Sequence, residues 1–246
     1  MNGQWKIAMA GALGGAVIAL AIVFGAAAVG TFPGAGDKAM HAYLEAHPEI
    51  LADMTSNLQT MQENQENSTR QVAVNKLGVK AFFDPRLAFV TGPKTAKTTL
   101  VEFFDYNCPY CRASIPAMKK YYAAHKGDTR FAFIEFPIKG PQSTVAARAA
   151  IAARNQPDKY VAFHFALMSE DDVTNDNMIY VDAQKAGIDI AKLKADMQKP
   201  EVDEAIARAK TLADAAKIDG TPAFIINGKM REGALDDTIL TQMAKG

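Results

Sequence analysis

Residues 98–111 read TTLVEFFDYNCPYC, and this stretch decides the fold. Its first seven residues are β-prone and apolar on both faces, which is typical of a central strand buried on two sides. Cys108 and Cys111 follow directly, and Pro109 suits the first position of a helix that begins after Cys108. A second apolar strand at 131–136 predicts a strand–helix–strand unit with parallel strands and a right-handed crossover.

Cys108 and Cys111 are the only cysteines among 246 residues, so the chain has no disulfide framework. At the N-cap, the Cys108 sulfur would face unpaired N–H groups at the positive end of the helix dipole, which lowers a thiol pKa. We therefore predict that Cys108 is the nucleophile and Cys111 the resolving thiol. The alternatives are a structural disulfide, which would stabilise little over so short a loop, and half of a zinc site, which usually needs four ligands.

Glu102 lies in the middle of the predicted strand, on the same face as Leu100 and Phe104. A carboxyl there is either a residue at the rim of an edge strand or a buried acid with a raised pKa. A buried acid beside the cysteines could exchange protons with Cys111 while the disulfide opens. Both interpretations stay open from the residues alone.

The remainder of this part of the chain predicts helices throughout 143–217, a strand at 222–227, a hairpin turn and a returning strand at 229–232. A last helix is expected at 235–243. Lys plus Arg and Asp plus Glu number 27 each, for a formal net charge of +0, so the composition does not suggest a nucleic-acid partner.

Residues 7–29 carry no charged or strongly polar side chain, a run long enough to span a bilayer core of about 30 Å. Lys6 precedes the run, which favours an N-terminus in the cytoplasm and export of the rest. The alternative is a cleavable signal peptide with its cleavage site at the alanines 26–28. Apolar regions of signal peptides usually run about 7–15 residues, so the length favours an uncleaved anchor.

A Gly- and Pro-rich linker at 31–36 leads into two predicted helices, the second with Pro48 in its first turn. In the second helix, apolar residues recur at alternating spacings of three and four: Leu51, Met54, Leu58 and Met61. This rhythm predicts either a coiled-coil seam, and thus a homo-oligomer through residues 50–72, or a helix packed on its own domain.

Two separate signatures resemble the DsbA superfamily of thiol–disulfide oxidoreductases: residues 101–111, and the run GTPAF at 220–224. The similarity spans roughly 80–246. The preceding segment, with HPE at 47–49 and FDP at 83–85, further resembles the ScsC-like (suppressor of copper sensitivity) branch, which has an N-terminal extension.

The resemblance implies an α/β, thioredoxin-like fold with an inserted helical subdomain, preceded by a transmembrane or signal helix and a helical leader. The expected domains are a signal anchor or signal peptide plus linker at 1–36, a leader and possible oligomerisation segment at 37–80, and a DsbA-like thioredoxin domain at 81–246, with its helical insert at about 140–217.

The resemblance also assigns site residues. In the family, the acid six residues before the nucleophile is buried and functional, the proline opposite the cysteines is cis, and the backbone beside it pairs with the substrate chain. The expected catalytic residues are therefore Cys108, Cys111, Glu102 and Pro222. We expect three further residues to contact substrate, namely Pro109, Tyr110 and Thr221, and we expect neither a cofactor nor a metal.

The expected partners are unfolded or partly folded exported proteins in the periplasm and a membrane redox partner, with tethering through residues 7–29. Strongly oxidising members usually carry Pro-His between the cysteines, whereas this chain has Pro109-Tyr110, so oxidase, isomerase and reductase all remain open. Two functions of different classes also remain open: a copper-binding or copper-protecting module that uses the reduced thiols as soft ligands, and a non-enzymatic assembly protein that uses the 50–72 helix.

Overall fold

The structure is a computed structural model and describes residues 37–171, 173 and 175–245. The chain divides into two compact units at the boundary between Glu63 and Asn64. The predicted anchor or signal segment at 7–29 and the predicted linker lie outside the described residues. Within the described part, no helix is long and apolar enough to cross a membrane.

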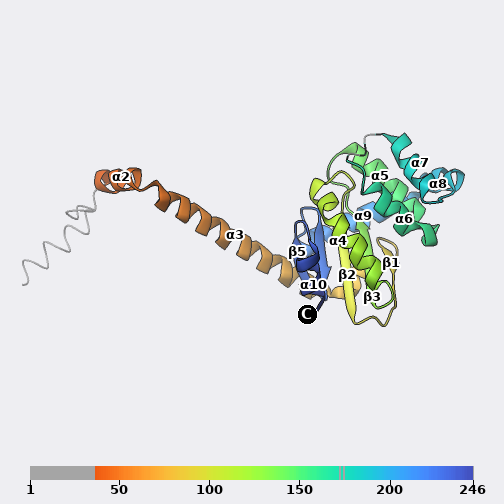
Figure 1. Cartoon of the computed structure of the whole chain (residues 1–246), viewed down its shortest axis with the longest axis horizontal. Coiled ribbons are helices and arrows are strands. Elements are labelled where there is room, and N and C mark those ends of the chain that lie inside the picture. Colours follow the sequence, from red (N-terminus) through yellow and green to blue (C-terminus); the bar gives the residue numbers. More distant parts are fainter. Residues whose placement is uncertain (1–36, 172, 174, 246) are drawn as a thin grey trace, which may run out of the picture. The chain divides into compact units, whose positions relative to one another are not determined.

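A mixed five-stranded sheet in the order β1-β3-β2-β4-β5 forms the centre of the second unit (Figure 1). Its strands are β1 (Phe89–Thr91), β2 (Thr98–Phe104), β3 (Thr129–Glu135), β4 (Ala223–Ile226) and β5 (Lys229–Glu232). Only the β2–β3 pair is parallel among these neighbours. The predicted strand–helix–strand unit is therefore confirmed, and β2 is central, as its two apolar faces predict.

Helix α4 (Pro109–His125) makes the crossover between β2 and β3. Helices then follow one another as predicted, from α5 to α9: α5 (Pro141–Ala153), α6 (Pro157–Leu167), α7 (Asp176–Lys185), α8 (Ile190–Asp196) and α9 (Pro200–Ala216). Helix α10 (Asp237–Lys245) follows the β4–β5 hairpin. This arrangement is the thioredoxin-like α/β fold that the resemblance implies, with the helices α5 to α8 gathered beside the sheet in Figure 1.

The two faces of the sheet bury two separate apolar cores, because alternate residues of a strand point to opposite sides. On one face, Leu100 and Phe104 of β2 belong to the core that also contains Cys108 and Cys111. On the other face, Val101 and Phe103 pack with Val74, the 3₁₀ helix η1 (Val79–Phe83) and α9. By this alternation Glu102 faces the core that holds the cysteines.

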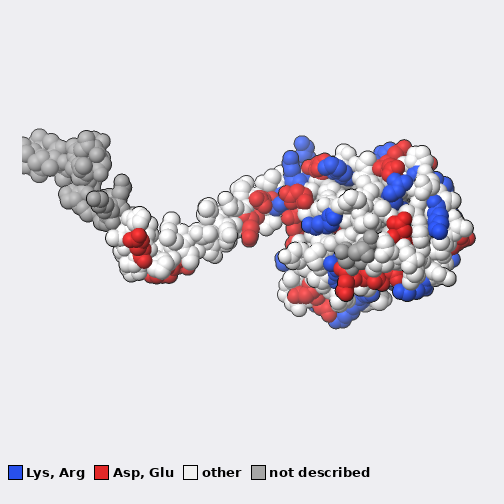
Figure 2. Space-filling view, turned by 90° about the horizontal axis from the view of Figure 1, so that it is seen from above, with Lys and Arg blue, Asp and Glu red and all other residues white. Residues whose placement is uncertain are grey.

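The leader contains α2 (Asp37–Ala46) and α3 (Pro48–Leu77). The four apolar residues of the predicted seam in α3 are all exposed, by 49% at Leu51, 61% at Met54, 56% at Leu58 and 70% at Met61. Residues 39–69 carry five Asp and Glu but no Lys or Arg. On the face of the second unit in Figure 2, by contrast, side chains of both charges are interspersed.

Strand β1 was not predicted from the sequence. It has three residues, too few for a period-two pattern to show, and it runs antiparallel at the edge of the sheet beside β3. Gly92 directly after it has a φ of +86°, and a Cβ there would overlap the carbonyl of Thr129. A glycine is therefore required where the chain leaves β1.

Candidate active site

Cys108 is the N-cap of α4, as predicted, with extended backbone angles (φ −87°, ψ 117°) and Pro109 as the first helical residue. The Cys108 N–H donates to the carbonyl of Asp105 at 3.1 Å, which closes the turn between β2 and the helix. The strand, the turn and the helix together fix the sulfur at the positive end of α4.

The pKa of the Cys108 thiol is lowered to about 5. The largest cause is a hydrogen bond from the Cys111 thiol, and burial opposes it. The Thr221 side chain and the backbone N–H groups of Cys111 and Tyr110 lower the pKa further. The helix N-terminus therefore contributes as predicted, but the neighbouring thiol contributes more.

Cys111 has the opposite electrostatic environment. Burial raises the pKa of its thiol, and the hydrogen bond that it gives to Cys108 raises it further, because losing that proton would break the bond. Neither thiol is exposed to solvent, although Cys108 lies at a shallower depth. At neutral pH the site therefore holds one thiolate and one thiol.

Glu102 is fully buried in β2, in register with Phe133 on β3 and Phe224 on β4. Burial raises its pKa to about 8, and neither of its carboxyl oxygens has a hydrogen-bond partner among the described residues. Its charge also raises the pKa of Cys111, so the two groups are close enough to interact. The buried-acid interpretation is confirmed and the rim interpretation is wrong, whereas a role in proton transfer stays a prediction.

Pro222 lies opposite the cysteines, and the Thr221–Pro222 bond is cis, as the resemblance implies. The Cys108 Sγ lies 3.0 Å from the carbonyl oxygen of Thr221, to which it donates when it is protonated. Among the other residues expected to contact substrate, Pro109 and Tyr110 are exposed and Thr221 is half-buried. The structure thus brings all four predicted catalytic residues to one region, with the exposed surface of Pro109 and Tyr110 beside it.

Asp105 is a site residue that the sequence analysis missed. Its buried carboxylate accepts from the backbone N–H groups of Asn107 at 2.8 Å, Ile138 at 2.7 Å and Lys139 at 2.8 Å. It thereby joins the turn before Cys108 to the loop after β3. An aspartate three residues before the nucleophile was visible in the sequence, but its partners on a distant loop were not.

His164 of α6 was also missed. It is fully buried, its Nδ1 lies 3.1 Å from the hydroxyl of Tyr106, and burial lowers its pKa to about 3. The imidazole is therefore neutral and packs edge-on against Phe104 below the cysteine turn. It is the only one of the four histidines that the structure buries among the described residues.

Within the described ranges, no three His, Cys, Asp or Glu side chains lie close enough together to hold a metal ion. A metal at the reduced cysteines would have two thiol ligands, fewer than the four of a typical structural zinc site.

Comparison with known proteins identifies the family. A family model described as thioredoxin matches residues 87–244. The chain belongs to the thioredoxin family. A solved structure of a thioredoxin-like oxidoreductase from Silicibacter pomeroyi DSS-3 is similar, with 37% identity and a TM-score of 0.62 over 68% of this chain and 96% of that one. The catalytic domain of Proteus mirabilis ScsC has 25% identity and a TM-score of 0.62 over 71% of this chain and 96% of that one.

Curated relatives agree with this family assignment. A probable disulfide bond formation protein D of Bacillus cereus is 27% identical over 157 residues, which are 59% of this chain and 72% of that protein. The chain spans about a quarter of the Na⁺/H⁺ antiporters NhaA that it also matches; the one of Herminiimonas arsenicoxydans is 29% identical over 158 residues, 64% of this chain and 25% of the antiporter. The expected resemblance to DsbA-like and ScsC-like thiol–disulfide oxidoreductases is confirmed.

Proposed function

We propose that this thioredoxin-family chain forms or isomerises disulfides in exported proteins, through its Cys108–Cys111 pair. The observation that carries the proposal is the contrast between the two thiols, with a pKa of about 5 at Cys108 and a raised pKa at Cys111. Thiol–disulfide exchange needs such a pair, because a thiolate is both the attacking and the better leaving group, and the resolving thiol must hold its proton until needed.

In the oxidising direction, a substrate thiolate attacks the Cys108 sulfur of the Cys108–Cys111 disulfide. The S–S bond breaks, a mixed disulfide forms, and Cys111 leaves with the electron pair and takes a proton. Glu102, protonated below about pH 8, can give that proton from the same core. A second substrate thiolate then attacks its own linked sulfur and releases Cys108 as a thiolate, so two electrons pass from substrate to protein.

In the isomerising direction, the reduced Cys108 thiolate attacks a wrong substrate disulfide and expels one substrate thiolate. That thiolate, or another one in the substrate, later attacks the mixed disulfide and restores Cys108. No net electron transfer occurs, so the reaction needs the reduced pair, whereas oxidation needs a membrane partner to reoxidise it.

Substrate binding would use the surface around the nucleophile. The backbone beside Pro222, directly before β4, would pair with a substrate chain as an added strand, and Pro109 and the 64% exposed Tyr110 border it. The Thr221 carbonyl now accepts from Cys108, and substrate binding would have to displace this contact.

The proposal extends to location and architecture. Residues 1–36 would export the protein and, through 7–29, anchor it to the inner membrane with the remainder in the periplasm. Residues 81–246 would form the oxidoreductase domain, with its helical insert at about 140–217. Residues 37–80 would form the leader, which can join copies of the chain through the exposed apolar residues of the 50–72 segment.

Trapping of mixed disulfides tests the assignment. Cys111→Ala should accumulate covalent adducts with exported proteins through Cys108, because the resolving thiol is missing, and Cys108→Ala is the matched control that should form none. Adducts on Cys111 in place of Cys108, or none from either variant, would contradict the proposed chemistry. The reduction potential of the pair, read with its redox state in the cell, then distinguishes an oxidase from an isomerase.

A further inference from the structure

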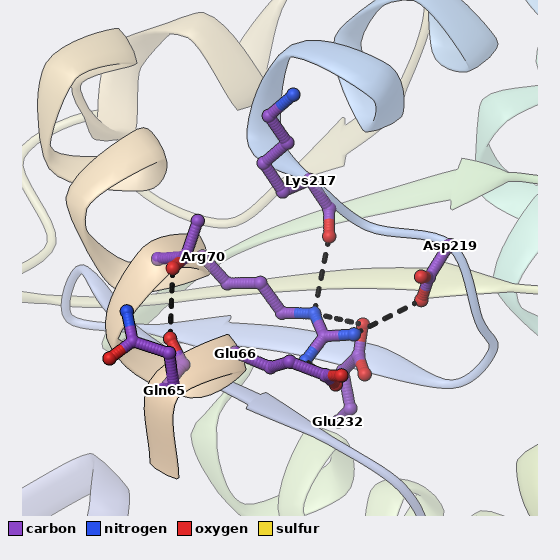
Figure 3. Close-up of polar contacts among 7 residues, drawn as sticks. Gln65, Glu66, Arg70, Lys217, Asp219 and Glu232 are labelled. Carbon is purple, nitrogen blue, oxygen red and sulfur yellow. Dashed lines mark hydrogen bonds and ion pairs between the residues drawn. The ribbon is translucent and has the colours of Figure 1, made fainter. Parts of the chain in front are cut away.

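Arg70, in the last turns of α3, lies against the loop that leads to Pro222 (Figure 3). Its Nε donates to the carbonyl oxygen of Lys217 at 3.2 Å, and its Nη2 donates to Asp219 Oδ1 at 3.2 Å. The Arg70 side chain is only 11% exposed. The nearly buried guanidinium of Arg70 thus contacts the loop at two residues, Lys217 and Asp219.

The same guanidinium also contacts the strand on the far side of Pro222. Arg70 Nε lies 3.2 Å from Glu232 Oε1, and Glu232 of β5 pairs with Ala223, the residue directly after Pro222. The N–H of Gly233 donates to the carbonyl of Pro222 at 2.9 Å. Arg70 therefore connects the segment before the proline to the strand that pairs with the segment after it.

The loop before Pro222 also contains the residue that contacts the nucleophile Cys108. The backbone carbonyl oxygen of Thr221, two residues beyond Asp219, lies 3.0 Å from Cys108 Sγ. Lys217 has a φ of +61°, in the left-handed region that side chains other than glycine rarely adopt. A backbone held in such a conformation needs support from its surroundings, and the Arg70 bond to the Lys217 carbonyl supplies it.

We propose that Arg70 is a positioning residue for the active site: by fixing Lys217 and Asp219 relative to β5, it holds Thr221 against Cys108. The inference rests on the proposed role of Cys108 and deepens it. It gives the end of the predicted leader a part in the chemistry, whereas that segment was expected either to join copies of the chain or to pack on its own domain.

The ultraviolet absorbance of the thiolate against pH, in the reduced full chain, tests this role. Arg70→Gln should shift the pKa of Cys108 by about 0.5–1 unit, because Thr221, whose carbonyl oxygen lies 3.0 Å from the Cys108 sulfur, is no longer held in place; this is a fraction of the 1–3 units that a nearby charge gives. Arg70→Lys keeps the positive charge beside Asp219 and should recover a substantial part of that shift.

Gln71→Ala is the matched control on the next residue. Gln71 donates to the Gly228 carbonyl at 2.8 Å and accepts from the Met230 N–H at 2.9 Å, so it anchors α3 to the β4–β5 turn and not to the loop before Pro222. Its loss should lower the unfolding midpoint without moving the pKa of Cys108.

An unchanged Cys108 pKa in Arg70→Gln, with a stability loss like that of Gln71→Ala, would show that Arg70 is an anchor alone and overturn the proposal. Should Arg70→Gln not fold, Asp219→Ala removes one contact at a position that is 80% exposed, and an unchanged pKa of Cys108 there has the same meaning. If Arg70→Gln shifts the pKa of Cys108 but Cys111→Ala traps no mixed disulfides, Arg70 still positions the site, and the proposed function is wrong.

Discussion

At the scale of single residues, the two thiols should titrate far apart. Alkylation of the reduced protein across pH should give a Cys108 midpoint near 5, with Cys111 unreactive until the solution is strongly alkaline. A pKa lowered from 9.0 stabilises the reduced fold; this contribution is present in full above about pH 9 and is lost as the pH falls through about 5. If Cys111 reacts first, the assignment of the nucleophile is wrong.

Glu102→Gln should keep the fold and slow thiol–disulfide exchange near neutral pH by about tenfold or more, because the amide has nearly the same shape but carries no transferable proton. Because the pKa of Glu102 is raised, the contribution of its protonated carboxyl to the stability of the fold is present in full below about pH 4.5. This contribution is lost as the pH rises through about 8. The free energy of unfolding, measured in urea, should therefore fall less in the variant than in the native chain between about pH 6 and 9. Exchange rates that are equal from about pH 5 to 8 would remove Glu102 from the mechanism.

The site residues that could be predicted from the sequence are those whose roles depend on neighbours close to them in the chain. Cys108, Pro109 and Cys111 form their site within one helical turn, and Glu102 is conspicuous inside a seven-residue apolar strand. Asp105 and Arg70 could not be recognised, because the partners that connect them to other elements lie 33 or more residues away and depend on the completed fold. The largest effect on the Cys108 pKa, the hydrogen bond from Cys111, also required coordinates.

At the scale of elements, the junction after β1 offers a sharp test. Gly92→Ala should lower the free energy of unfolding by about 1–3 kcal/mol, because the backbone has a positive φ and the added methyl group meets the Thr129 carbonyl. Gly127→Ala is the control, since nothing lies within 4 Å of a Cβ there and its φ is not in the restricted range. Chemical denaturation measures both. If the two variants have the same free energy of unfolding, β1 can move to accommodate the added methyl group without loss of stability, and the prediction is wrong.

Elements were predictable where a hydrophobic pattern was long enough to repeat. Strand β2 matches its predicted bounds, and α4 follows from the proline at its first position. The heptad rhythm of α3 could be followed to Val72 in the sequence, with polar residues in place of apolar ones at the two seam positions after Met61, but the helix continues to Leu77 and buries Val74. Contacts with the core, and not a periodic pattern in the sequence, explain why the helix continues after Val72.

At the scale of the whole molecule, association through α3 can be measured by sedimentation. Residues 37–246 should form an oligomer if a second copy covers the exposed Leu51, Met54, Leu58 and Met61, whereas residues 64–246 should be monomeric. The shorter chain begins at Asn64 because Arg70, Gln71 and Val74 belong to the second unit.

Salt should strengthen this association. The five acidic residues between 39 and 69 repel their counterparts in a neighbouring copy, and about 0.15 M salt screens such charges beyond about 8 Å. Monomers of both lengths at every salt concentration would leave the seam without a role in assembly.

The thiol of Cys111 beside Cys108 protects the protein against lasting damage by peroxide. Hydrogen peroxide converts a reachable thiolate to sulfenic acid, and a second equivalent carries it on to sulfinic acid, which most cells cannot reverse. Cys108 is a thiolate with no exposed surface, and Cys111 lies within hydrogen-bonding reach of it. Any sulfenic acid formed there condenses with the neighbouring thiol, releases water and gives the Cys108–Cys111 disulfide. The damage pathway thereby ends in the working oxidised state, and only a chain that has lost Cys111 should accumulate the irreversible acid.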